Sequence, residues 1–175
     1  AAVNHSVATA LAKLHTVSVD RMKGTLRSVG TTRQQATQWL TESRAAWEGL
    51  KASSAIMDAG FAWLAEHLPL TEGDHVVMHG DFGLNNILID GDAVSAVLDW
   101  EFVQTGHAGY DIGYFHCMAT ALGRWEDFLA SYEQAGGTLP SPEALDFFIL
   151  FSNVRLATMV WQGATAFELH QFNEL

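Results

Sequence analysis

The sequence lacks most of the features that mark secreted and membrane-bound proteins. Its 175 residues contain a single cysteine, Cys117, which excludes an internal disulfide and fits a reducing compartment. The longest unbroken aliphatic and aromatic run is Phe147–Phe151, far shorter than the roughly 20 residues that a bilayer span needs. The first residues lack the basic start and apolar block of a signal peptide. We therefore expect a cytoplasmic protein that does not bind membranes.

Basic residues are scarce as well. Nine Lys and Arg stand against 20 Asp and Glu, which gives a net charge of −11, and only Arg124 and Arg155 lie beyond residue 51. A surface of this kind repels phosphate backbones, so we expect no nucleic-acid partner. It favours divalent metal ions and a cationic small-molecule acceptor. Acidic residues that serve only to keep a protein soluble would give the same composition.

Apolar patterning indicates a globular protein that is mainly helical. Apolar residues make up 49% of the chain and charged residues 17%, which is typical of a sequence that buries a core. The length fits one domain over residues 1–175. Apolar side chains recur at helical spacing over residues 4–15, 33–50, 55–68, 112–122, 125–132 and 142–167. We expect a loop or a partly ordered insertion over residues 16–32, and an α+β fold in which α-helix dominates.

The strand signals are concentrated in one stretch, Val76–Glu101. Two short apolar runs, Asn86–Asp90 and Ala93–Leu98, are separated by the dipeptide Gly91-Asp92. Glycine after or before an acidic residue is typical of a tight turn, so the two runs predict a β-hairpin.

Polar residues flank this hairpin at both ends. His79 and Asp81 precede the first run, Asn86 lies five residues beyond Asp81, and Asp99 follows the second run. Because the ends of a hairpin lie together, two carboxylates and an amide can converge on one point. Phosphoryl transfer asks a protein mainly for positioning, metal ions and an oriented nucleophile, and this arrangement suits it.

The motif His79-Gly80-Asp81-x-x-x-x-Asn86, followed by Leu98-Asp99-Trp100-Glu101, resembles the aminoglycoside phosphotransferase and choline kinase-like family. Those proteins have a protein-kinase-like fold, and the protein-kinase template of the same motif is H-R-D-x-x-x-x-N followed by D-F-G. The resemblance implies that Asp81 is the catalytic base, which accepts a proton from the substrate hydroxyl. It implies that Asn86 and Asp99 hold Mg²⁺ on the phosphates of ATP or GTP.

The same resemblance implies supporting roles for other residues. His79 would hold the catalytic loop by packing and hydrogen bonding, and Asp111 would brace that loop through backbone amides rather than react. Leu88 and Leu98 would form the floor under the adenine. Glu101 would touch the substrate or a second metal ion, or would be a solvated loop carboxylate.

The sequence lacks the motifs with which the N-terminal lobe of a kinase binds the nucleotide phosphates. The sequence contains no G-x-G-x-x-G and no G-x-x-x-x-G-K-[ST], and none of its three lysines lies in a strand pattern. The resemblance therefore covers the C-terminal lobe alone, with a small β-hairpin carrying the catalytic residues. We expect a longer kinase that transfers the γ-phosphoryl of ATP or GTP to an aminoglycoside- or choline-like acceptor. Without the N-terminal lobe, we expect this chain to be weakly active or inactive.

Two other functions remain open. One is a non-catalytic kinase-like lobe that binds a partner, although retention of Asp81, Asn86 and Asp99 together favours the kinase. The other is a metal-dependent hydrolase built on His79, Asp81 and Asp99. His75 and His79 have the spacing of a zinc pair on a helix, but a strand would separate them by about 13 Å.

Overall fold

The structure, a computed structural model, describes residues 2–22, 24–26 and 30–172. The helices in chain order are α1 (Ala2–His15), α2 (Thr32–Gly49), α3 (Ala55–Glu66), α4 (Gly109–Leu122), α5 (Trp125–Gln134) and α6 (Pro142–Phe172). The strands are β1 (His75–Met78), β2 (Ile87–Asp90), β3 (Ala93–Val97) and β4 (Gln104–His107). This composition confirms the expected mainly helical α+β class.

The strands form two small antiparallel pairs. β2 and β3 make the predicted hairpin around Gly91-Asp92, with a register irregularity between Leu88 and Ile89. β1 pairs with β4, so that His75 lies opposite His107. The sequence gives no signal for β4, because Gln104–His107 is polar, and glycines at 106, 109 and 113 predict a loop that leads into α4. The strand exists through its pairing with β1, which local sequence does not encode.

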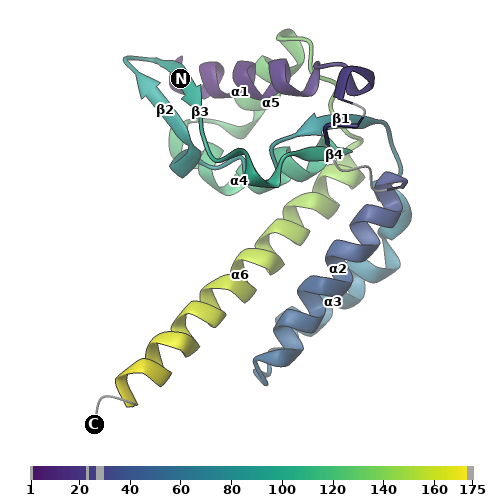
Figure 1. The fold of residues 1–175 in the computed structure, drawn as a ribbon, viewed down its shortest axis with the longest axis vertical. Coiled ribbons are helices and arrows are strands. Elements are labelled where there is room, and N and C mark those ends of the chain that lie inside the picture. Colours follow the sequence, from purple (N-terminus) through teal and green to yellow (C-terminus); the bar gives the residue numbers. More distant parts are fainter. Residues whose placement is uncertain (1, 23, 27–29, 173–175) are drawn as a thin grey trace.

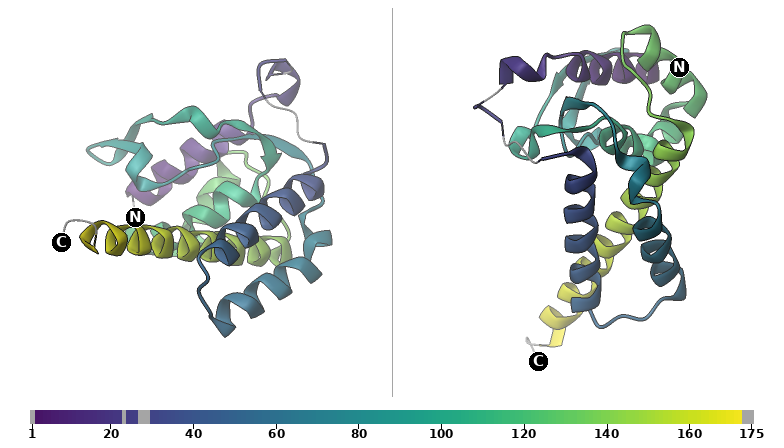
Figure 2. Two further views of the ribbon diagram at one scale, coloured as in Figure 1. Left: turned by 60° about the horizontal axis from the view of Figure 1, so that its bottom comes forward. Right: turned by 90° about the vertical axis from the view of Figure 1, so that its right-hand side faces the viewer.

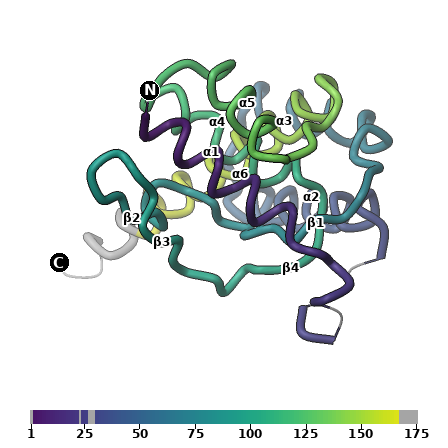
Figure 3. The backbone as a smooth tube through the Cα atoms, turned by 90° about the horizontal axis from the view of Figure 1, so that it is seen from above, coloured from purple at the N-terminus to yellow at the C-terminus, as the bar shows by residue number. Residues whose placement is uncertain are grey.

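The elements are arranged in two groups joined by α6 (Figures 1 and 2). α1, α4, α5 and both strand pairs lie together at one end, and Figure 3 shows α1 beside α5. α2 and α3 lie beside the length of α6 at the other end. α6 therefore contacts α4 near its start and both α2 and α3 further along.

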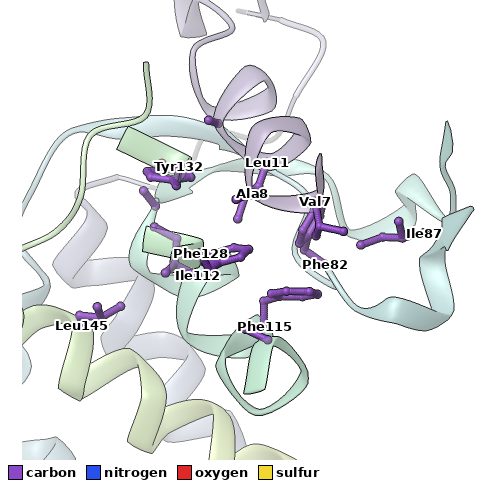
Figure 4. Packing of buried hydrophobic residues seen from close by; sticks show 13 residues of the cluster. Val7, Ala8, Leu11, Phe82, Ile87, Ile112, Phe115, Phe128, Tyr132 and Leu145 are labelled. Carbon is purple, nitrogen blue, oxygen red and sulfur yellow. The ribbon is translucent and has the colours of Figure 1, made fainter. Parts of the chain in front are cut away.

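One hydrophobic core fastens the segment between β1 and β3 to the helices around it (Figure 4). Val7 and Leu11 of α1 pack there against Phe115 of α4, together with Phe82 from the loop after β1 and Ile87 at the start of β2. Burying an aromatic or branched side chain of this size contributes about 1.5–3 kcal/mol. The residues on either side of the motif are thus part of the folded core.

A second core lies between α2, α3 and α6. Trp47, Phe61 and Phe148 are buried there, and Met78 at the end of β1 reaches the same cluster. Tyr110 at the start of α4 also belongs to it. The two cores therefore meet at the ends of β1 and α4, on either side of the residues that follow Met78.

The start of α2 is fixed by a capping box. The Thr31 hydroxyl accepts a hydrogen bond from Gln34 N at 3.1 Å, and Gln34 Oε1 accepts one from Thr31 N at 2.9 Å. These reciprocal bonds satisfy backbone donors that the first helical turn leaves free. The helix begins at Thr32, one residue before the expected position.

The end of α6 differs from the expectation. The helix continues to Phe172 rather than ending near residue 167. The helical spacing of the apolar residues predicts that Val160 faces inward, but this side chain is 72% exposed. The side chain of Phe167 lies outside the described residues. By length and composition α6 is apolar enough to cross a membrane, but 44% of its most apolar window is buried inside the protein. A helix that packs in a core passes the same test.

Candidate active site

The backbone of the loop that follows β1 is hydrogen-bonded to the side chain of Asp111. One oxygen of the Asp111 carboxylate, Oδ2, accepts a hydrogen bond from His79 N at 2.7 Å, and the other, Oδ1, accepts one from Gly80 N at 2.9 Å. Asp111 is completely buried in the first turn of α4. A carboxylate that accepts from charged or backbone donors in a buried site makes stronger hydrogen bonds than a neutral acceptor. The backbone at the start of the loop therefore has a fixed position.

His79 links this loop to the hairpin. Its Nδ1 accepts a hydrogen bond from Asp81 N at 3.2 Å, and its Nε2 donates to the Leu98 carbonyl at 2.8 Å. These partners require the neutral tautomer that carries its proton on Nε2. The ring is buried and lies 4.7 Å from the ring of Trp100. His79 has no free donor or acceptor for chemistry, and its contacts are those of a positioning residue.

Asp81 and Asn86 are in direct contact. The Asn86 side-chain amide donates to Asp81 Oδ2 and to the Asp81 carbonyl, each at 2.9 Å. The backbone carbonyl of Asn86 in turn accepts a hydrogen bond from Leu98 N at 2.8 Å. The two polar residues on which the motif depends are therefore joined to each other and to the residue before Asp99.

The carboxylate of Asp81 has a second neighbour, Tyr114 of α4. Burial, followed by a hydrogen bond to the Asp81 side chain, raises the pKa of Tyr114 to about 12. The phenol therefore stays neutral and serves Asp81 as a hydrogen-bond donor. Tyr114 gives no signal in the sequence, because an aromatic residue inside a helix is most simply read as core.

Asp99 occupies a left-handed backbone conformation directly after β3. Its φ and ψ are 63° and 61°, values that few residues other than glycine, asparagine and aspartate tolerate. The residue is exposed, and its neighbour Leu98 is bonded to both Asn86 and His79. The sharp turn of the backbone lets a carboxylate follow the strand immediately. Strain of this kind is concentrated at functional sites.

The apolar residues predicted under the nucleotide are accessible. Leu88 and Leu98 are 49% and 43% exposed, although each lies in or beside the hairpin. Trp100 and Phe102, which follow on the chain, are also large and exposed. Glu101 between them is an exposed carboxylate. The hairpin side of the site thus presents apolar surface that the described part of the chain does not cover.

The zinc interpretation gains no support from the geometry. Among the residues that the structure describes, no group of three or more His, Cys, Asp or Glu side chains gathers as a metal-binding cluster. His75 and His79 lie at the beginning of β1 and just beyond its end. Asn86 and Asp99 offer hard oxygen donors, the type that Mg²⁺ prefers, and Mg²⁺ typically takes its remaining ligands from water and substrate phosphates.

A cavity opens beside the loop on the side of α2 and α6. Its volume is about 200 Å³, and Gly80, Trp39, Tyr110 and Arg155 contribute to its wall. The Arg155 guanidinium lies over the rings of Tyr110 and Tyr114, 5.9 and 5.7 Å from their centroids. The motif around Asp81 does not predict this arginine at the site. The one available signal was its rarity in the acidic part of the chain.

Comparisons with known proteins agree with this geometry. A sequence model of the phosphotransferase enzyme family matches residues 5–148. Acyl-CoA dehydrogenase family member 11 from Mus musculus is 28% identical over 181 residues, covering 90% of this chain and 23% of that protein. Macrolide 2′-phosphotransferase type I has a TM-score of 0.71 at 23% identity, covering 93% of this chain and 53% of that one. Choline kinase from Cryptosporidium parvum Iowa II has a TM-score of 0.57 at 14% identity, covering 91% and 58%.

The two structural likenesses are too distant in sequence to show more than a shared fold. The chain spans less than a quarter of the mouse protein and little more than half of each of these solved structures. The name of the mouse protein therefore describes a much longer polypeptide. The match to the family model, in contrast, extends over most of this chain.

Proposed function

The chain belongs to the phosphotransferase enzyme family, and from this membership we propose that it is the C-terminal catalytic lobe of a small-molecule kinase. The reaction is transfer of the γ-phosphoryl group of ATP or GTP to a hydroxyl of the acceptor. The observation that carries the proposal is the contact between Asp81 and Asn86, 2.9 Å from amide nitrogen to carboxylate oxygen, beside the backbone that leads to Asp99. Kinase-like phosphoryl transfer uses these three residue types at this spacing.

Asp81 is the residue that accepts the proton of the acceptor hydroxyl. Its Oδ2 is oriented by the side-chain amide of Asn86, and Tyr114 of α4 is a further neighbour of the carboxylate. A general base must lie within hydrogen-bond reach of the proton that it accepts, and this orientation supports that role. An oriented carboxylate aligns the hydroxyl for in-line attack and takes its proton as the bond to phosphorus forms.

Asn86 and Asp99 are the residues that would hold Mg²⁺ together with the nucleotide phosphates. When bound, Mg²⁺ neutralises charge on the phosphate oxygens. Leu88 and Leu98 provide apolar surface for the base of the nucleotide. His79 and Asp111 keep the loop in place, and Glu101 is available to contact the acceptor.

A second lobe is part of this proposal. The exposed apolar residues of the hairpin side would be covered by an N-terminal nucleotide-binding lobe, and a kinase lysine would come from that lobe. The coverage of about half of the solved relatives supports this arrangement. By itself the chain should turn over ATP very slowly or not at all.

Metal and nucleotide titration tests the proposal. We expect Mg²⁺ with ADP to raise the midpoint of thermal unfolding of the chain, because a ligand that binds only the folded state stabilises it. The variant Asp99→Asn should lose this shift. Asp92→Asn, which changes an exposed carboxylate in the turn of the same hairpin, should keep it. Stabilisation by Zn²⁺ without nucleotide would indicate the hydrolase, and no response to any of these ligands in a polypeptide that also carries the nucleotide-binding lobe would indicate a non-catalytic binding lobe.

The base is tested in a polypeptide that also carries the nucleotide-binding lobe. Asp81→Asn should lower kcat by about 10²–10⁴-fold, the range typical of general-base catalysis, with little effect on Mg²⁺–ADP binding. Loss of nucleotide binding in this variant, or an unchanged kcat, would contradict the role given to Asp81.

A further inference from the structure

Arg155 is a charged side chain whose hydrogen-bonding capacity is not used. Its Nη1 is buried without a hydrogen-bond partner. Within the described part of the chain, the guanidinium has ring contacts but no ion pair. Arginine does not lose its proton in proteins, so the charge remains. A partly buried cation with unmatched donors costs free energy unless a partner supplies acceptors.

The position of Arg155 connects it to the reacting group. The guanidinium lies over the ring of Tyr114, and Tyr114 interacts electrostatically with Asp81. Burial raises the pKa of Tyr110, the other ring beneath the guanidinium, to about 12. Both phenols are therefore neutral and do not balance the charge. The unmatched cation lies one aromatic ring away from the proposed base, and it lines the cavity that opens beside Gly80.

The other charged residue of the cavity wall is already satisfied. Glu42 also lines the cavity, but it is exposed and accepts a hydrogen bond from Gln38 at 2.8 Å. Water and this amide serve its carboxylate. A ligand therefore gains more by pairing with Arg155 than with Glu42.

The second arginine of the acidic part of the chain behaves differently. Arg124 is exposed, and its Nε lies 3.4 Å from a carboxylate oxygen of Glu126 on the surface. Over residues 52–175 these are the two basic residues among 17 acidic ones. The acidic remainder repels anions, so a cation in the cavity is a local feature rather than a consequence of composition.

From these observations we propose that the acceptor of the phosphotransferase reaction carries an anionic group, a carboxylate or a phosphate, which Arg155 binds. The inference rests on the proposed function and specifies the class of its acceptor. A guanidinium presents parallel N–H donors that match both oxyanions. The acceptor is then a hydroxy acid or a phosphorylated alcohol, whose anion pairs with Arg155 while its free hydroxyl reaches Asp81. This differs from the cationic acceptor that the overall charge favours.

Binding of four small probes of similar size tests the inference without nucleotide. Glycerate and glycerol 3-phosphate carry the two anions, glycerol is neutral, and serinol is a cation. The indole N–H signal of Trp39, assigned by loss in Trp39→Phe, reports the cavity because its ring lies 4.4 Å from that of Tyr110. Titration in buffer with EDTA prevents any metal from holding the anions.

We expect at least one anionic probe to shift the Trp39 signal in a saturable manner, and glycerol and serinol not to do so at equal concentration. Binding of glycerate would indicate a carboxylate on the acceptor, and binding of glycerol 3-phosphate would indicate a phosphate. Arg155→Met should weaken that binding by about tenfold or more, as expected for loss of hydrogen bonds to a charged group. Arg155→Lys keeps the charge but lacks the parallel N–H donors of the guanidinium, so it should lose less affinity for the anion. The surface control Arg124→Met should bind the anion like the unmodified protein.

Two results would overturn the inference. One is equal or tighter binding of serinol or glycerol, or no anion-dependent shift in the unmodified protein. The other is anion binding that Arg155→Met leaves intact while the variant remains folded by circular dichroism. Because no nucleotide is present, these outcomes are separate from those of the Mg²⁺–ADP titration, and either proposal can fail while the other stands.

Discussion

His15 and Asp111 meet in the core of the protein, with 3.1 Å between Nε2 and Oδ2, although 96 residues separate them in the sequence. The other ring nitrogen, Nδ1, pairs with the hydroxyl of Tyr132 at 2.7 Å. Burial raises the pKa of Tyr132 well above its ordinary value, so the phenol remains a donor. One residue from each of α1, α4 and α5 thus takes part in a chain of hydrogen bonds that ends at the carboxylate that holds the loop after β1.

Replacing Asp111 should therefore damage the loop and the core together. In Asp111→Asn the side chain keeps one acceptor oxygen and turns an NH₂ group toward a backbone N–H, which leaves buried donors unmatched. We expect the free energy of unfolding, measured by urea denaturation, to fall by about 2–4 kcal/mol. The matched control is Asp127→Asn, an exposed carboxylate in the first turn of α5, which should lose less than about 1 kcal/mol. Equal losses in the two variants would show that Asp111 acts only through the helix dipole.

Gly80 cannot carry a side chain without moving the loop. Its φ is +84°, and a β-carbon there would lie 2.6 Å from the carbonyl oxygen of Phe102. Gly80→Ala should therefore destabilise the protein by more than the roughly 1 kcal/mol that a positive φ costs alanine, and should displace Asp81. Gly91→Ala is the matched control, because Gly91 has a φ of +60° but open space around it. If both variants lose the same free energy of unfolding in urea, the close approach to Phe102 has no cost.

Variants of Asp99 separate the effect of backbone strain on stability from the effect of losing the carboxylate proposed to hold the metal ion. Because its φ is 63°, glycine at this position relieves strain, so Asp99→Gly should be more stable than Asp99→Ala by about 1 kcal/mol. Both variants should lose the Mg²⁺–ADP effect, since neither has a carboxylate. At Asp90, in the strand β2, the order should reverse, with glycine less stable than alanine. Thermal and urea unfolding of the four variants measures these differences. Equal stability of Asp99→Gly and Asp99→Ala would contradict the left-handed backbone conformation at residue 99.

His107 should make stability depend on pH. Burial, with a smaller effect of the nearby His15 and His75 rings, lowers the pKa of His107 from 6.5 to about 4. Its Nδ1 accepts a hydrogen bond from Gly109 N at 3.0 Å, which a protonated ring cannot do. Between about pH 6.5 and 4 the unfolded chain therefore takes up a proton that the folded protein excludes, and stability falls as the pH falls.

The contribution of His107 to this loss is about 3 kcal/mol across that window and is absent at higher pH. Urea unfolding at pH 7 and at pH 5 should show a smaller pH difference in His107→Gln than in the unmodified protein. An identical pH difference in both proteins would mean that His107 does not titrate as described.

The sequence predicted the elements whose signals are local. Gly91-Asp92 between two apolar runs predicts the hairpin, and the spacing of Asp81 and Asn86 predicts residues that are indeed in contact. The strand β4 gave no such signal, because its residues are polar and its pairing partner lies about 30 residues earlier in β1. Arg155 was missed for a related reason. Its relation to Tyr114 arises from the packing of α4 against α6, which a helical pattern does not specify.

The backbone of Leu98 gives the site a mechanical property. Its N–H is bound by the Asn86 backbone carbonyl and its carbonyl by His79, so one peptide segment ties the hairpin to the loop that follows β1. Under the proposed function, any displacement of the hairpin would move the proposed metal ligands and the support of the proposed base in the same direction. A change of acceptor would then have little freedom at the hairpin and more at the cavity walls contributed by α2 and α6, where side chains can change without altering that alignment.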